Sequence, residues 1–118
     1  MIASLQKSGK VRTGTRFSVD RLMMPVINEA VLCVTEHIAN VNDIDMACIA
    51  GIGMKKGEER MGPLQLADEM GLDVVLEKLE ALQKEFGERF RPARLLRTKV
   101  RAGHLGRKVG KGFKEYTA

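Results

Sequence analysis

The sequence predicts an all-α domain built from about five helices. Three observations lead to this fold class. Apolar residues recur at steps of three and four over several segments, which is the spacing of one helix face. Glycine, proline and asparagine stand at the ends of these segments, where helices begin and end. Alternation of apolar and polar residues, the pattern of a half-buried strand, is nearly absent.

The first helix is expected over residues 19–38. Its apolar positions follow three- and four-residue steps: Val19, Leu22, Met23, Val26, Ile27, Ala30, Val31 and Val34. Leu32 and Cys33 widen this face, so we expect the helix to be buried on more than one side. Pro25 lies inside the helix and has no amide to donate to the carbonyl of Arg21, which predicts a kink.

The second helix is expected to begin after Asn40, because asparagine is a favoured N-cap and Asp43 stands where a capping box has its acid. Gly51 and Gly53 are expected to stop it. Its inward stripe comprises Ile44, Ala47, Cys48 and Ile52. The next stretch, MKKGEER, is expected to be an exposed, charged loop.

A short third helix is expected over residues 62–71. Pro63 suits its first turn, and Gly71 ends it. Leu64, Ala67 and Met70 are expected to face inward, with Leu66 at the edge. Because this segment is so short, we expect it to link two larger helices. The fourth helix is expected to be capped by Asp73 and stopped by Gly87, with an inward stripe of Val75, Leu76, Leu79, Leu82 and Phe86.

The fifth helix is expected to run from Pro92 to Gly103, with Leu95, Leu96 and Val100 inward. The tail after it has four glycines and no sustained period, so we expect a loop that ends in a short extended piece. Residues 1–17 are expected to be a linker or a frayed terminus. The helical domain is then residues 18–118.

The composition indicates one globular domain: 118 residues, 44% hydrophobic and 30% charged. Cys33 and Cys48 fall in helical patterns and form no C-x-x-C pair, which favours buried, reduced thiols. The sequence contains no apolar run long enough to cross a bilayer, and its N-terminal stretch lacks the apolar middle of a secretory signal. We therefore expect a cytoplasmic protein.

Residue types suited to catalysis are few. Of the two histidines, His37 lies where its imidazole suits the dipole at the end of the first helix, and His104 is expected to be solvated. No metal-ligand spacing is apparent. Two glycine patterns, in residues 51–57 and 106–112, resemble nucleotide-binding loops but lack the preceding strand or the required spacing. The chain itself is therefore expected to bind no cofactor and no metal.

The net charge of +5 is unevenly spread, since residues 88–118 hold ten basic and two acidic residues. Arg91, Arg94, Arg97 and Arg101 recur at three- or four-residue steps, a pattern that suits contact with phosphates. One alternative function is therefore a basic, helical nucleic-acid-binding module. We favour the polar face of an amphipathic helix, because no aromatic residues interleave to stack on bases.

Four stretches, taken in order, resemble the C-terminal domain of the 3-hydroxyacyl-CoA dehydrogenase family. They are FSVDRLMMPVINEA, NVNDIDMACIAGIG, MGPLQLADEMGLDVV and RFRPARLLRTKVRAGHLGRKVGKGFKEY. The first two resemble the opening helices of that domain, the third its Gly-Pro segment, and the last its closing helix and tail. Their joint order and spacing cover roughly residues 17–116.

The resemblance implies a helical domain of an NAD-dependent enzyme of fatty-acid β-oxidation or related acyl-CoA metabolism. In that family, an N-terminal Rossmann domain binds NAD and supplies the catalytic His–Glu pair, so no catalytic residue is expected in this chain. The resemblance thus implies that residues 1–17 are a linker or the end of a missing nucleotide-binding domain. The helical domain supplies a dimer interface and one wall of the acyl-CoA cleft. We therefore expect a homodimer, to which the first helix and residues 74–86 contribute. A fused enoyl-CoA hydratase occurs in some relatives.

Two departures from the family are apparent. Asp20 occupies the position of an asparagine that, in the family, lies near the 3-oxygen of the substrate, so it is the one substrate-binding candidate. An ionised carboxylate there would repel the developing oxyanion, and losing a donor of this kind costs about 3 kcal/mol. Asp20 is equally well explained as a helix cap, and a non-catalytic structural adaptor is a further alternative. The second departure is an insertion at residues 55–60, which is expected at the cleft rim.

Overall fold

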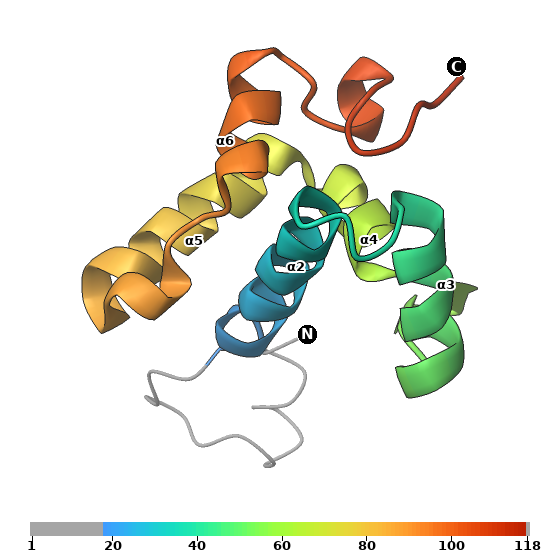
Figure 1. Ribbon diagram of the computed structural model, residues 1–118, viewed down its shortest axis with the longest axis horizontal. Helices are drawn as coiled ribbons and strands as arrows, with labels where there is room; N and C mark the ends of the chain where they lie inside the picture. The colour runs from blue at the N-terminus through green and yellow to red at the C-terminus, as the bar shows by residue number, and fades with distance from the viewer. Residues whose placement is uncertain (1–17, 118) are drawn as a thin grey trace.

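The computed structural model describes residues 18–117, which form five α-helices, one short hairpin and two 3-10 turns (Figure 1). The predicted all-α fold class is confirmed. The linker expected over residues 1–17 lies outside the described residues. The helices are α2 (Asp20–Thr35), α3 (Val41–Ile52), α4 (Pro63–Met70), α5 (Leu72–Phe86) and α6 (Arg94–Arg101). Among the described residues, no helix combines the length and the apolar character that spanning a bilayer requires.

Helix α2 lies at the centre, with α5 and α6 on one side and α4 and α3 on the other (Figure 1). The core forms where these helices meet and consists almost entirely of aliphatic side chains, as a sequence with only four Phe, one Tyr and no Trp requires. Its buried members are Met24, Ile27, Ala30, Val31, Leu64, Ala67, Leu72, Val75, Leu79, Ala93 and Leu96.

Helix α2 is shorter than the predicted 19–38. The amide of His37 donates to the carbonyl of Val34 (3.1 Å), and the amide of Ile38 donates to that of Cys33 (3.0 Å). This pair of bonds is a Schellman motif, which ends the helix. His37 has a φ of 57°, in the left-handed region where glycine is usual. The helix continues past Pro25, and the kink expected there stays a prediction.

The predicted ends of α3 are largely confirmed. The side chain of Asn40 accepts the amide of Asp43 (2.9 Å) as N-cap, and Gly53, with a φ of 67°, is the C-cap. The expectation that Gly51 helps to stop the helix was wrong, because Gly51 lies inside it.

The predicted inward stripe of α3 was partly wrong. Ile44 and Cys48 are half-buried, but Ala47 is exposed and Ile52 is 71% exposed. The only fully buried side chain of this helix is Asp45. Helix α3 packs mainly on α4, so much of its apolar surface stays uncovered in the described chain.

The stretch expected to be a loop after α3 is exposed as predicted, but it forms a hairpin. Strand β1 (Lys55–Lys56) pairs antiparallel with β2 (Glu59–Arg60), so that Lys55 lies opposite Arg60 and Lys56 opposite Glu59. Gly57 has a φ of 61° in the two-residue connection, where tight hairpins favour glycine.

The link between α4 and α5 is a single residue. Gly71, with a φ of 99°, is both the C-cap of α4 and the N-cap of α5. The prediction that Asp73 caps α5 was therefore wrong, because Asp73 lies within the first turn. Its carboxylate contacts Lys108 Nζ at 2.6 Å, and this hydrogen bond lowers the pKa of Asp73.

Helix α6 begins at Arg94, two residues after the predicted start at Pro92. Asn28, buried on α2, explains the delay. Its side chain donates to the carbonyl of Arg91 (3.0 Å) and accepts the amide of Ala93 (2.8 Å). These bonds hold the segment before α6 extended against α2, after the 3-10 turn η1 (Glu88–Phe90).

The tail after α6 is folded rather than an open loop. It contains the 3-10 turn η2 (Arg107–Val109) and two isolated bridges, Gly106 to Lys111 and Lys111 to Glu115. Figure 1 shows this segment as a compact turn beside α4.

Candidate functional site

An apolar pocket opens where the start of α2, the hairpin and α4 meet. It encloses about 380 Å³. Leu66 and Met70, one turn apart on α4, lie on the same face of that helix and supply one wall. The other lining residues are Ser18, Val19, Asp20 and Met23 from the α2 side and Lys55, Lys56 and Gly57 from the hairpin. The pocket is thus largely apolar, with charged groups from the α2 side and the hairpin.

Asp20 is the first residue of α2 and one of the charged groups at this pocket. Lys78 on α5 contacts its carboxylate, with 2.5 Å between Nζ and Oδ2. Both side chains are more than a third exposed, so the pair itself is worth at most about 1 kcal/mol. The pair matters instead for the charge at the pocket, because the ammonium group of Lys78 balances the negative charge of Asp20.

The alternative role of Asp20 as helix cap was wrong. Val19 is the N-cap residue of α2, and no side chain donates or accepts a capping hydrogen bond there. The acidic side chain of Asp20 in the first turn still suits the positive end of the helix dipole.

A second buried carboxylate organises the Gly-Pro segment. Asp45 on α3 is 2% exposed and accepts the amides of Leu64 (2.8 Å) and Gln65 (3.0 Å). Asp45 thus caps α4 from another helix, since the N-cap residue Gly62 has no side chain to do so. A Cβ atom at Gly62 would collide with the backbone of Asp45, which explains the glycine.

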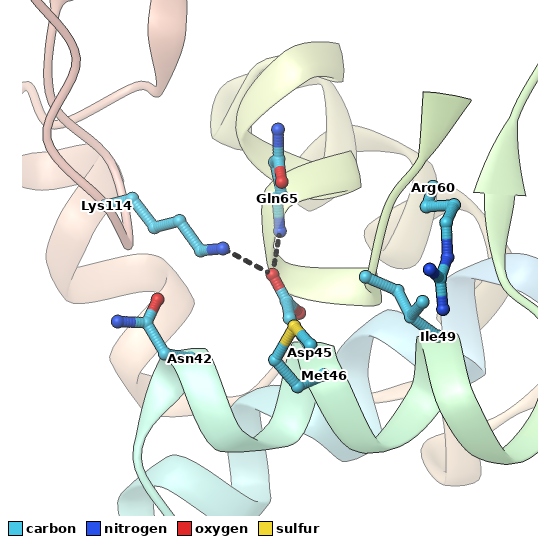
Figure 2. Close-up of a pocket in the computed structure, with 7 residues that line it drawn as sticks. All are labelled: Asn42, Asp45, Met46, Ile49, Arg60, Gln65 and Lys114. Atoms are coloured by element: carbon cyan, nitrogen blue, oxygen red, sulfur yellow. Dashed lines mark hydrogen bonds and ion pairs between the residues drawn. The ribbon is translucent and has the colours of Figure 1, made fainter. Parts of the chain in front are cut away.

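Lys114 from the tail completes the surroundings of Asp45, with its Nζ 3.0 Å from Oδ2. Figure 2 shows Lys114 and Gln65 converging on this carboxylate. The cavity around it encloses about 360 Å³. Because Asp45 is fully engaged by α4 and Lys114, we assign it a structural role.

A third carboxylate, Asp68 on α4, holds the tail. It is 1% exposed and accepts three hydrogen bonds, from the amides of Phe113 (2.9 Å) and Lys114 (3.0 Å) and from the hydroxyl of Tyr116 (2.7 Å). Burial raises the pKa of Tyr116, and the hydrogen bond to Asp68 raises it further. Gly106 and Gly112, part of the pattern that resembles a nucleotide-binding loop, pack so closely on Asp68 that a Cβ atom would collide with it.

The histidines and cysteines form no catalytic constellation among the described residues. His37 lies exposed beyond α2, in the Schellman turn, and His104 is half-buried. Both cysteines are free, and each is half-buried, whereas the sequence predicted buried thiols. Burial, then the charges of Asp45 and Cys33, raise the pKa of Cys48. Within residues 18–117, no group of three or more His, Cys, Asp or Glu side chains is placed to hold a metal ion.

The basic side chains singled out in the sequence do gather on one surface. Arg91, Arg94, Arg97 and Arg101 line a shallow cavity of about 480 Å³ along α6. Arg97 forms an ion pair with Glu80 of α5 at 3.1 Å, so at least this arginine serves the packing of α6 on α5.

Asp20 was predicted from the sequence, whereas Lys78, Asp45 and Asp68 were not. The sequence did hold a sign of the two buried aspartates. Each lies beside the apolar stripe of its helix, a position where an acidic residue is unusual unless it has a buried partner. Lys78 had none, since 58 residues separate it from Asp20.

Comparison with known proteins gives a consistent result. Residues 17–116 match the family described as 3-hydroxyacyl-CoA dehydrogenase, C-terminal domain. A probable 3-hydroxybutyryl-CoA dehydrogenase of Deinococcus radiodurans is 47% identical over 102 residues, which are 85% of this chain and 34% of that protein. Its counterpart in Bacillus subtilis is 40% identical over 98% of this chain and 40% of that protein.

A solved structure supports the same relationship. The (S)-3-hydroxybutyryl-CoA dehydrogenase from Ralstonia eutropha superimposes with a TM-score of 0.82 at 36% identity, over 99% of this chain and 42% of that one. The chain thus spans only about a third to two fifths of the length of the relatives it matches.

Proposed function

The chain belongs to the 3-hydroxyacyl-CoA dehydrogenase family as its C-terminal domain, and on this premise we propose that it forms one wall of the acyl-CoA cleft in a longer, cytoplasmic, NAD-dependent enzyme. The relatives named above are 3-hydroxybutyryl-CoA dehydrogenases, which favours a short 3-hydroxyacyl group as substrate. The family resemblance assigns NAD and the His–Glu pair to a separate Rossmann domain. The reaction therefore requires that domain.

One observation carries this proposal. Asp20, at the position of the family's substrate-contacting asparagine, lines a pocket walled by Met23, Leu66 and Met70. A 3-hydroxyacyl thioester needs such a site, because its alkyl chain is apolar and its 3-oxygen is polar. A volume of about 380 Å³ is within the usual range for small-molecule sites.

The ion pair of Asp20 with Lys78 resolves the difficulty that a carboxylate raises at this position. When bound by the separate domain that the resemblance implies, NAD would supply the hydride chemistry at carbon 3 of the substrate. Reduction of the ketone builds negative charge on the 3-oxygen, which a bare carboxylate would repel. Lys78 Nζ lies 2.5 Å from Oδ2 of Asp20, so it offsets the charge of the carboxylate and places an ammonium group beside a residue that lines the pocket. Met23, Leu66 and Met70 give the rest of the pocket an apolar lining.

We also propose that the domain dimerises through its uncovered apolar surface. Leu22 is 63% exposed and Val26 is 37% exposed, one turn apart on α2. On α3, Met46 is 60% exposed and Ile52 is 71% exposed. Exposed apolar residues grouped on two neighbouring helices are typical of a protein interface. These helices differ in part from the sequence expectation, which named α2 and α5.

Filling the pocket tests the proposed function. The experiment uses a protein in which this chain follows the nucleotide-binding domain of the Deinococcus radiodurans relative, and it measures NADH oxidation with acetoacetyl-CoA. Met70→Trp should raise the KM at least tenfold or abolish turnover, because the indole occupies the acyl site. Val109→Trp, at a residue that is 51% exposed and outside the pocket lining, is the control. Equal activity of the two variants would contradict the acyl-cleft assignment.

Light scattering during size-exclusion chromatography tests the dimer. The chain should elute at twice its mass of 13.1 kDa, and Met46→Glu with Ile52→Glu should halve that mass. A monomeric wild-type chain would contradict this part of the proposal.

A further inference from the structure

We infer that the β1–β2 hairpin is a phosphate-binding rim of the acyl pocket, with Lys55 and Lys56 holding the phosphate groups of a CoA thioester. This inference rests on the proposed function and assigns a role to the insertion at residues 55–60. It concerns how the ligand is held, not how the redox step proceeds.

The position of the two lysines carries the inference. Lys55 and Lys56 line the same pocket as Leu66 and Met70, so cationic groups stand beside an apolar wall. A ligand that satisfies both must be amphipathic, with an apolar part in the pocket and an anionic part at the hairpin. A neutral apolar ligand would leave the lysines unused, and a simple anion would leave the apolar wall in water.

The charges on the hairpin are only partly compensated within it. Lys55 lies directly opposite Arg60 in the strand register, and like charges placed this way destabilise a sheet. Neither lysine forms an ion pair with another residue in the described part of the chain. Lys56 has the acidic Glu59 opposite it. A bound anion would remove the repulsion between Lys55 and Arg60.

Two neighbouring carboxylates, those of Asp20 and Glu59, already interact with other cations. Asp20, the acidic residue among those that line the pocket, is held by Lys78. The pKa of Arg107 is raised chiefly by its hydrogen bond to Glu69, with a smaller contribution from Glu59, so the charge of Glu59 also acts on that guanidinium. The hairpin lysines therefore add net positive charge to the edge of the pocket.

The hairpin is attached firmly enough to present these groups. The amide of Met61 donates to the carbonyl of Met54 at 3.2 Å, just beyond the paired residues, and the Met61 side chain is 2% exposed. Gly57 closes the connection in a left-handed conformation, so the two strands have a defined register. The two lysines thus belong to a hairpin that is fixed to the rest of the domain at its base.

Binding of CoA thioesters to the 118-residue chain tests the inference. Butyryl-CoA, butyryl-dephospho-CoA and butyryl-pantetheine are titrated by NMR into the wild-type chain and into the variant K55Q/K56Q. The control variant K84Q/K111Q removes the same charge from exposed residues outside the pocket lining. Because all four lysines are exposed, neither double variant should change the fold, which the spectra of the free chains check directly.

We expect K55Q/K56Q to raise the Kd for butyryl-CoA about fivefold, from the loss of two exposed charge contacts, and to leave that for butyryl-pantetheine unchanged. If the effect persists with butyryl-dephospho-CoA, the lysines bind the diphosphate, and if it disappears they bind the 3′-phosphate. Either result supports the inference. The control variant should bind all three thioesters as the wild type does.

Three results would overturn it: no binding of butyryl-CoA by the wild-type chain, equal weakening of butyryl-CoA and butyryl-pantetheine, or equal effects of the two double variants. Failure of the proposed function has a different signature. In that case the chain binds butyryl-CoA through the lysines, but the protein joined to a nucleotide-binding domain does not oxidise NADH with acetoacetyl-CoA.

Discussion

Replacing Asp45 with alanine should destabilise the domain far more than an ordinary surface change. Asp45 is 2% exposed and accepts the amides of Leu64 and Gln65, which are otherwise unpaired at the start of α4. Asp45→Ala would leave two buried donors unsatisfied and would remove the partner of Lys114. Loss of an N-cap costs up to about 2 kcal/mol, and losing the contact with Lys114, whose side chain is 24% exposed, adds about 1 kcal/mol, so we expect a total of about 3 kcal/mol.

Urea unfolding followed by circular dichroism measures this free energy. Asp43→Ala is the matched control, because Asp43 lies on the same helix but is exposed, and its amide rather than its carboxylate bonds to Asn40. We expect the control to cost less than about 1 kcal/mol. The reasoning about Asp45 would be refuted if both variants lost the same stability. A domain of this size has a total stability of only about 5–15 kcal/mol, so the expected loss is easily measured.

Three further predictions follow from single contacts. His37→Gly should raise the free energy of unfolding by about 1 kcal/mol, because glycine adopts the φ of 57° without the strain of a side chain; an unchanged thermal midpoint would contradict this. Tyr116, the only tyrosine, should show no tyrosinate absorbance at 295 nm as the pH rises through 10, because its pKa is raised by burial and then by the bond to Asp68. Because the folded state keeps the hydroxyl neutral while the unfolded chain ionises it, the free energy of unfolding should fall as the pH rises above 10. Tyr116→Phe should abolish that fall. In the joined enzyme, Lys78→Met should lower kcat about tenfold by exposing the charge of Asp20, and adding Asp20→Asn should restore it; an inactive double variant would count against the ion-pair argument.

The features predicted correctly from the sequence are those encoded by near neighbours. Asn40 and Gly53 end α3 through contacts within a few residues, and Pro63 begins α4 for the same local reason. The apolar stripe of α5 was likewise readable, since Val75 and Leu79 are one turn apart and both fully buried.

The features that were missed depend on residues distant in sequence. Asp45 caps α4 across 19 residues, and Asp68 fixes the tail across 45 or more. Asp73 was expected to cap α5, but the tail supplies Lys108 as its partner and leaves Gly71 as the N-cap. No periodic pattern encodes such pairings, because they exist only after the helices have packed.

The pocket was only partly predictable for the same reason. The family resemblance identified Asp20, and the unusual length of the segment before the Gly-Pro pair indicated that residues 55–60 lie at the cleft rim. Its apolar wall from α4 and the balancing Lys78 required the folded arrangement.

The most direct test of the account measures NADH oxidation with acetoacetyl-CoA by three proteins: this chain alone, the nucleotide-binding domain of a relative alone, and the two joined. Each part alone should be inactive and the joined protein should turn over, because we propose that the helical domain closes the cleft while a separate domain holds the nicotinamide. Turnover by the chain alone, or a joined, folded protein that binds NADH but never reduces acetoacetyl-CoA, would contradict the account.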